Sequence, residues 1–165
     1  GEETHQDSLI RTEYSLKTIT DNGIEMHRLA RGIGNWMRSP AYEQMLRWLN
    51  EYGDSIEVVL SNNDEMAMGV IEALKEKGML ESGPLIVGID GGEDAKEEIR
   101  QGHMRGTVVN DADGQARAIV KIACAYVQGK DPEKEVPNLK GKYAFISHYT
   151  FSTQDLIKEE RSHES

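Results

Sequence analysis

The hydrophobic pattern alternates between helical and strand-like segments along most of the chain. Apolar spacing and typical terminal residues predict six helices: 7–21, 39–53, 64–74, 93–101, 111–129 and 153–160. Between them, short β-branched or apolar runs predict five strands: 24–29, 56–60, 84–89, 106–109 and 143–147. Because strands alternate with helices, the pattern indicates an α/β fold with a parallel sheet.

Several side chains have an expected place in these elements. Ser39 should cap the second helix, with Pro40 in its first turn. Trp48 should be half-buried on that helix, and Cys124 should be a buried helical thiol. The third helix should bury an inner face of Ala67, Val70, Ile71 and Leu74, and Met66 and Met68 should fill the core rather than form a binding face.

Composition removes several classes of function. The 165 residues include 19 Lys and Arg against 29 Asp and Glu, giving a net charge of −10, so nucleic acid and anionic membranes should be repelled. A single cysteine forms no internal disulfide and no thiolate zinc site. Phosphate-loop, hydrolase-triad and EF-hand spacings are absent or incomplete, which argues against the common enzyme classes.

Polar residues follow three of the predicted strands. Asn62, Asn63 and Asp64 come after the 56–60 strand, Asp90 after the next strand, and Asn110 with Asp111 after the strand at 106–109. Ligands of open parallel sheets bind beyond the carboxyl ends of the strands. Amides and carboxylates there suit a neutral polyhydroxylated ligand such as a sugar, although each residue alone could simply cap the helix that follows.

Further candidates lie near the chain start and in a glycine-rich stretch. His5, Asp7 and Arg11 cluster at the first helix, where a guanidinium beside a carboxylate forms a rigid fork for hydroxyl oxygens. The simpler interpretation is a capped helix with a surface ion pair. Trp36 falls outside any apolar periodicity, and an exposed indole could stack on a sugar ring.

The order and spacing of these residues resemble a known family over nearly the whole chain. The matching features are His5-x-Asp7-x-x-x-Arg11, Trp36, Ile56-Glu57-Val58-Val59-x-x-Asn62-Asn63-Asp64-x-Met66-Ala67-Met68-Gly69, Gly88-Ile89-Asp90, and Thr107-Val108-x-Asn110-Asp111-x-x-x-Gln115-Ala116. They are similar to the galactose/glucose-binding proteins of bacterial ABC transporters, which are type I periplasmic binding proteins. The similarity is looser from Lys130 onward.

The resemblance implies a Rossmann-like lobe that binds a hexose in a cleft between two lobes. Hydrogen bonds to the sugar would come from His5, Asp7, Arg11, Asn63, Asp90 and Asn110, with Trp36 stacked on the ring. The closed form would be recognised by the ABC permease membrane subunits and by a chemoreceptor. The expected location is periplasmic, or extracellular with a lipid anchor in a Gram-positive source.

The same resemblance implies that the sequence holds one incomplete lobe. Residues 1–110 would form the C-terminal sugar-binding lobe without its first strand. Residues 111–147 would be a hinge crossover that packs on an N-terminal lobe, and 148–165 would return as a strand, a helix and a frayed tail. Apolar residues after Asn110 should then be exposed or covered by a second copy of the chain.

A calcium site is a family property that the sequence supports only in part. The family completes a calcium loop with a glutamate that matches Glu57, but the loop itself would lie before Gly1. We therefore expect no cofactor in this sequence and Ca²⁺ only where the upstream loop is present.

Two function hypotheses remain at this point, and a third, a Rossmann-like enzyme, would need a catalytic group upstream of this sequence. The first is a non-enzymatic, substrate-binding component of an ABC sugar importer. The alternative is the effector-binding half of a sugar-responsive transcriptional repressor, which shares the fold. The acidic charge and the His5-x-Asp7-x-x-x-Arg11 spacing favour transport.

Overall fold

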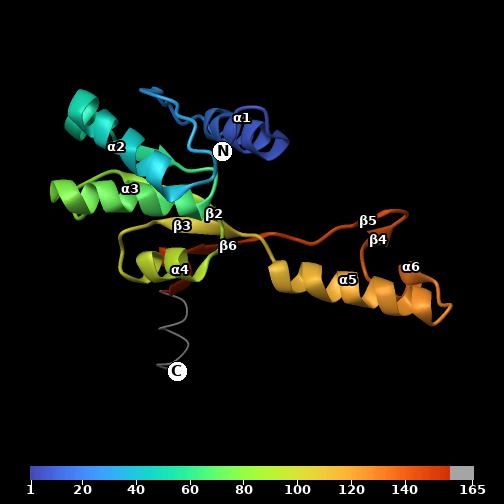
Figure 1. The fold of residues 1–165 in the computed structure, drawn as a ribbon. Coiled ribbons are helices and arrows are strands. Elements are labelled where there is room, and N and C mark those ends of the chain that lie inside the picture. The colour runs from blue at the N-terminus through green and yellow to red at the C-terminus, as the bar shows by residue number, and fades with distance from the viewer. Residues whose placement is uncertain (157–165) are drawn as a thin grey trace. The chain divides into compact units, whose positions relative to one another are not determined.

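The computed structural model describes residues 1–156 (Figure 1). Backbone contacts divide the chain into two compact units. The first consists of Gly1–Val108 and the segment that starts at Thr150, and the second of Val109–Tyr149. The packing of residues 111–147 on another lobe stays a prediction.

The first unit has the predicted α/β organisation around a four-stranded sheet of order β1-β2-β3-β6. Strands β1 and β2 run parallel, with Val59 opposite Ile86. The helices and strands, in chain order, are α1 (Gln6–Asp21), α2 (Arg38–Tyr52), the 3₁₀ helix η1 (Gly53–Ser55), β1 (Val58–Leu60), α3 (Asp64–Lys77), β2 (Leu85–Asp90), α4 (Glu93–Arg100), β3 (Gly106–Val109) and β6 (Tyr149–Ser152).

The second unit contains a long helix and a short hairpin. Helix α5 (Ala112–Val127) begins after Asp111, whose carboxylate accepts a hydrogen bond from the Gly114 N–H. Helix α6 (Pro132–Glu135) follows, and β4 (Leu139–Lys140) pairs antiparallel with β5 (Tyr143–Ala144). Of the strand predicted at 143–147, only Tyr143 and Ala144 form a strand, and this strand is one arm of the hairpin. The predicted last helix is helical at 153–156, and its remainder and the tail lie outside the described residues.

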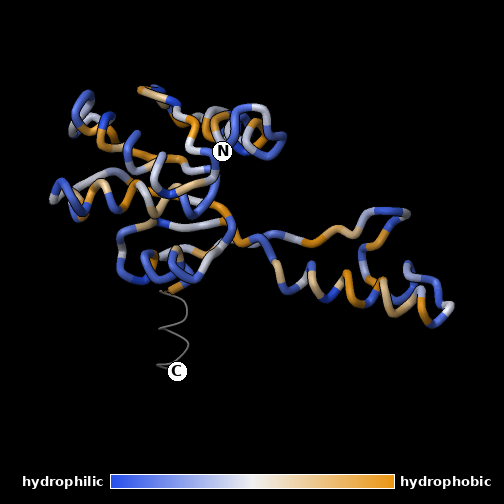
Figure 2. The backbone as a smooth tube through the Cα atoms, viewed as in Figure 1, coloured by the Kyte–Doolittle hydropathy of each residue, from blue (hydrophilic) through white to orange (hydrophobic). Residues whose placement is uncertain are grey.

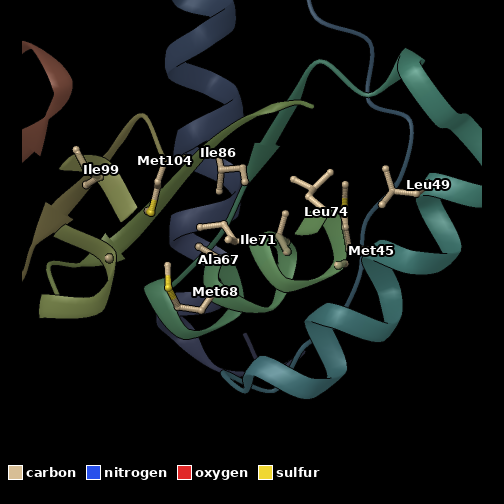
Figure 3. Packing of buried hydrophobic residues seen from close by; sticks show 12 residues of the cluster. Met45, Leu49, Ala67, Met68, Ile71, Leu74, Ile86, Ile99 and Met104 are labelled. Carbon is tan, nitrogen blue, oxygen red and sulfur yellow. The ribbon is translucent and has the colours of Figure 1, made fainter. Parts of the chain in front are cut away.

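Helix α3 provides the centre of the core, as its apolar spacing predicts. Ala67, Ile71 and Leu74 are almost completely buried, and Met66 and Met68 are buried too. Figure 3 shows Ile86 of β2 beside this helix, with α2 residues at one end of the cluster and Ile99 and Met104 at the other. Trp48 is partly buried against the same cluster, which confirms its predicted place.

Helices α2 and α3 pack unusually closely because α3 carries a glycine at the contact. A Cβ at Gly69 would lie 2.2 Å from the carbonyl oxygen of Arg38 and 2.9 Å from the Tyr42 nitrogen. Figure 1 shows the two helices side by side. The backbone-to-backbone approach therefore requires glycine at this position.

The strand predicted at 24–29 is not formed. This segment has no regular secondary structure, and it lines a cavity of about 470 Å³ together with α1 and β1. Strand β1 lies at the end of the sheet order, so within residues 1–156 its outer edge has no strand beside it. The segment faces a cavity and pairs with no strand, so its apolar residues alone do not make it a strand.

Two side-chain predictions are also wrong. Helix α2 begins at Arg38 and its N-cap is Met37, so Ser39 lies inside the first turn and does not cap it. Cys124 is exposed, because α5 buries only Ala118 and Ala125 among its own residues. Figure 2 shows hydrophobic stretches along α5, and the large hydrophobic residues exposed there are Ile119, Val120, Tyr126 and Val127.

The Gly69 contact generates a stability prediction. Gly69→Ala should lower the free energy of unfolding by about 1–3 kcal/mol, because the new methyl group collides with backbone that does not move aside easily. In an unobstructed helix the same change would stabilise by up to about 1 kcal/mol. Urea denaturation of Gly69→Ala and of the exposed α3 control Lys77→Ala measures the difference. A Gly69→Ala protein as stable as the control would contradict this packing.

Candidate functional site

The N-terminus of α1 brings three predicted site residues to one place. His5 is the N-cap, and its Nδ1 accepts a hydrogen bond from the Asp7 N–H at 3.2 Å. Asp7 and Arg11 lie one turn apart and form an ion pair at 3.6 Å. The capped helix with an ion pair is therefore real. It leaves His5 Nε2 as that ring's second polar atom, and this nitrogen can still serve a ligand.

Arg11 connects α1 to the ends of two strands. Its Nη1 donates to the carbonyl oxygen of Asn62, just after β1, at 2.8 Å. The same nitrogen lies 3.5 Å from Oδ1 of Asp90, at the end of β2. The guanidinium carbon also sits 5.7 Å from the centre of the Trp36 ring. One planar group thus orders two carboxylates and an aromatic ring.

Trp36 is held in an unusual backbone conformation. Its φ is +64°, and that of Asn35 is +48°, which are left-handed values that bulky side chains rarely adopt. The His5 ring meets the Trp36 ring edge-on, with centroids 5.3 Å apart and planes at 82°. The Asn63 amide donates to the Trp36 carbonyl at 3.1 Å. These contacts from α1 and α3 fix the indole despite the backbone strain.

Asn63 has the capping role that its residue type allows. Its Oδ1 accepts from the Met66 N–H at 3.1 Å, so it is the N-cap of α3. The side chain is buried. Its amide thus serves the helix and the Trp36 backbone, and only the remaining lone pair and N–H could serve a ligand.

Asp90 ends β2 with a strained backbone and a perturbed carboxyl group. Its φ of +126° lies in a region that side-chain-bearing residues seldom adopt. Burial raises the pKa of the Asp90 carboxyl group, the negative charge of Asp64 adds to this, and the attraction of Arg11 opposes it. Strain and desolvation at one residue are typical of functional sites.

The first unit therefore gathers six of the seven predicted site residues: His5, Asp7, Arg11, Trp36, Asn63 and Asp90. Asn110 belongs to the second unit, where its side-chain oxygen accepts from the Gln115 amide at 2.6 Å. Its role toward a ligand stays a prediction.

Asn62 and Asp64, which the sequence offers as ligand or capping groups, have structural roles instead. The Asn62 side chain donates to the Ser8 carbonyl at 3.2 Å and to the Thr12 hydroxyl at 2.8 Å, which ties α1 to the end of β1. Asp64 is buried and bonds to the residues after Asp90. Their only sequence signal is a position directly after a strand.

The described residues do not fit a calcium site. Calcium takes six to eight oxygen ligands in most proteins. Glu57 is exposed just before β1, and residues 1–156 contain no group of three metal-ligating His, Cys, Asp or Glu side chains. Within the same residues, no helix has the length and hydropathy to span a bilayer.

Residues 1–131 match the model of the periplasmic binding protein domain. The chain belongs to the periplasmic binding protein family. Among curated relatives, the D-galactose/methyl-galactoside binding periplasmic protein of Haemophilus influenzae is 36% identical over 131 residues, which cover 79% of this chain and 39% of the relative. The xylitol-binding protein of Mycolicibacterium smegmatis is 37% identical over 103 residues, covering 62% of this chain and 29% of the relative.

A solved structure of the family supports the same assignment. It is an ABC transporter solute binding protein from Bacillus halodurans with bound myo-inositol. It matches with a TM-score of 0.78 and 31% identity, over 98% of this chain and 52% of that protein. This periplasmic binding protein chain thus spans about half the length of the relatives it matches, or less. The proteins named here bind solutes and are not enzymes.

The raised pKa of Asp90 predicts a pH-dependent effect of Asp90→Asn. A carboxyl group whose pKa is higher in the folded state stabilises the fold below its unfolded-state pKa, and this stabilisation is lost as pH rises through the folded-state value. At pH 7 the ionised Asp90 should therefore destabilise the fold, and Asp90→Asn should be the more stable protein. The gain should be small because the carboxylate is partly exposed.

Urea denaturation at two pH values tests this. The stability difference between Asp90→Asn and the unchanged protein should be present at pH 7 and disappear near pH 3, where both side chains are neutral. The exposed Asp54→Asn is the matched control. Lower stability of Asp90→Asn at pH 7 would mean that the attraction to Arg11 outweighs desolvation.

Proposed function

We propose that this chain contains most of the C-terminal lobe of the solute-binding protein of an ABC importer and that it binds a sugar at the site around Arg11. The observation that carries the proposal is the Arg11 guanidinium, which lies between the carboxylates of Asp7 and Asp90 and beside the Trp36 ring. Sugar and polyol ligands require such a mixture of donors, acceptors and an aromatic surface.

Each group at the site has a defined capacity for hydroxyl groups. The guanidinium donates to hydroxyl oxygens, and each carboxylate accepts from hydroxyl hydrogens, so neighbouring hydroxyls can be bound in pairs. Nε2 of His5 adds one further donor, because Nδ1 already accepts from the Asp7 N–H. Trp36 supplies an apolar face for the C–H groups of a ring. The bound solute is then neutral and polyhydroxylated.

A hexose, D-galactose or D-glucose, is the ligand we favour. Its support is the relative from Haemophilus influenzae, whose name states galactose and methyl-galactoside binding. Relatives named for xylitol and D-apiose, and a structure with myo-inositol, are similar as well. The experiment below therefore compares several ligands.

The partners and location in this proposal follow from the relatives. They are named as periplasmic or ABC transporter binding proteins, so we propose a periplasmic protein that delivers sugar to the permease membrane subunits. A chemoreceptor as a second partner, a lipid anchor, calcium binding and self-association stay predictions from the sequence.

Binding should require both lobes of a two-lobed protein. The chain spans about half of the related structure, so a second lobe would supply further contacts to the sugar. Contacts from both lobes would stabilise a closed state by population shift. The 165-residue chain alone should bind sugar weakly.

Arg11→Lys in the two-lobed protein tests the site. Lysine keeps the charge but loses the planar fork, so sugar affinity should fall about ten- to a hundredfold. Isothermal titration calorimetry with D-galactose, D-glucose, xylitol, D-apiose and myo-inositol measures the affinity. Arg47→Lys, an exposed position on α2, is the matched control and should bind normally.

The outcomes separate the parts of the proposal. Binding of none of these ligands by the unchanged protein would contradict sugar binding. Binding of a polyol without a hexose would contradict only the favoured ligand. Equal affinities of Arg11→Lys and the control would show that the sugar binds elsewhere.

A further inference from the structure

Asp64 is a buried carboxylate that holds the loop after β2. It is the first residue of α3, directly after the N-cap, and is only 6% exposed. Its Oδ2 accepts hydrogen bonds from the N–H groups of Gly91 at 2.7 Å and Gly92 at 2.9 Å. Its Oδ1 accepts from the hydroxyl of Thr107 on β3 at 2.8 Å. Three donors thus satisfy a charge that would be unfavourable in isolation.

The loop that Asp64 binds contains the strained site residue. Asp90 has a φ of +126°, and Gly91 follows with +76°. A residue with a side chain keeps such a conformation only when its surroundings enforce it. The bonds to Asp64 begin at the next peptide N–H, and the Gly91 N–H also reaches the Thr107 hydroxyl at 3.2 Å.

The neighbouring strand is shaped to admit this carboxylate. A Cβ at Gly88 of β2 would lie 2.3 Å from Asp64 Oδ1 and 2.6 Å from the Met104 methyl carbon. Only glycine leaves this space. Asp64 therefore occupies a fitted place between β2 and β3, and among residues 1–156 its hydrogen bonds go to Gly91, Gly92 and Thr107 and not to Arg11 or Trp36.

We propose that Asp64 is a positioning residue for the sugar site: it fixes the loop Asp90–Gly92 and thereby aims the Asp90 carboxylate at the ligand. This inference rests on the proposed sugar binding of Asp90. Asp64 itself does not touch the sugar. Thr107 completes the arrangement by joining Asp64 to β3.

A double-mutant cycle in the two-lobed protein distinguishes positioning from general stabilisation. Asp64→Ala should weaken sugar binding about tenfold or more, as removal of a supporting hydrogen-bonded charge does. If Asp64 acts through Asp90, the double variant Asp64→Ala/Asp90→Ala should bind within about twofold of Asp90→Ala alone. Effects that multiply would overturn the proposal.

Three further variants serve as controls. Asp64→Asn should stay within about threefold of the unchanged protein, since its amide oxygen can still accept from both glycine N–H groups. Gly69→Ala, which we expect to destabilise the lobe away from this loop, should leave affinity unchanged. Thr107→Val removes one of the three hydrogen bonds to Asp64, so it should weaken sugar binding less than Asp64→Ala does. It takes the place of Asp64→Ala in the test if that variant does not fold.

Amide hydrogen exchange without sugar tests the same residue independently of ligand binding. Relative to the amides of α3, exchange at Gly91 and Gly92 should rise about tenfold in Asp64→Ala and remain unchanged in Gly69→Ala. Unchanged exchange at both glycines in Asp64→Ala, or in Thr107→Val if Asp64→Ala does not fold, would overturn the positioning role. If exchange changes as expected while no sugar binds, the proposed function fails and the loop constraint stands.

Discussion

The candidate site depends on the hydrogen bonds between α1 and Asn62. The side chain of Asn62 binds Ser8 and Thr12 of α1, and its carbonyl oxygen accepts from Arg11. Helix α1 buries little apolar surface, because Leu9, Ile10 and Tyr14 are exposed. These hydrogen bonds therefore contribute much of the attachment of α1 to the end of β1. Without them, Arg11 would not meet the Asp90 carboxylate.

The site is assembled at the expense of local stability. Trp36 and Asp90 have positive φ values, and burial disfavours the ionised form of Asp90. Each such backbone conformation costs about 1–3 kcal/mol. The well-packed core around Ile71 and Leu74 supplies the stability that tolerates this strain. A rigid scaffold with strained residues at its edge keeps polar groups in place before a ligand arrives, which reduces the ordering that binding requires.

Much of the fold and most of the candidate site could be predicted from the sequence. Helix α3 follows from its apolar spacing, and the polar residues after β1 and β2 follow from the rule that parallel strands end at one edge. The strand predicted at 24–29 is wrong because a strand needs a neighbouring strand, which the local pattern does not reveal. The predicted burial of Cys124 is wrong because the burial of a helix face depends on what packs against it. The hydrogen bonds of Asp64 cannot be predicted from the local sequence, because they join residues 27 to 43 positions apart.

On the proposed function, the geometry of the site suits more than one polyhydroxylated ligand. Galactose, xylitol and myo-inositol, which the names of three relatives print, all carry hydroxyl groups on adjacent carbons. A guanidinium and a carboxylate held 3.5 Å apart match such a pair whatever the rest of the molecule is. A ring and an open chain differ instead in the flat C–H surface they offer to Trp36. On the proposed function, Arg11 and Asp90 therefore select the chemical class, while selection between cyclic and acyclic members depends on contacts such as that of the indole.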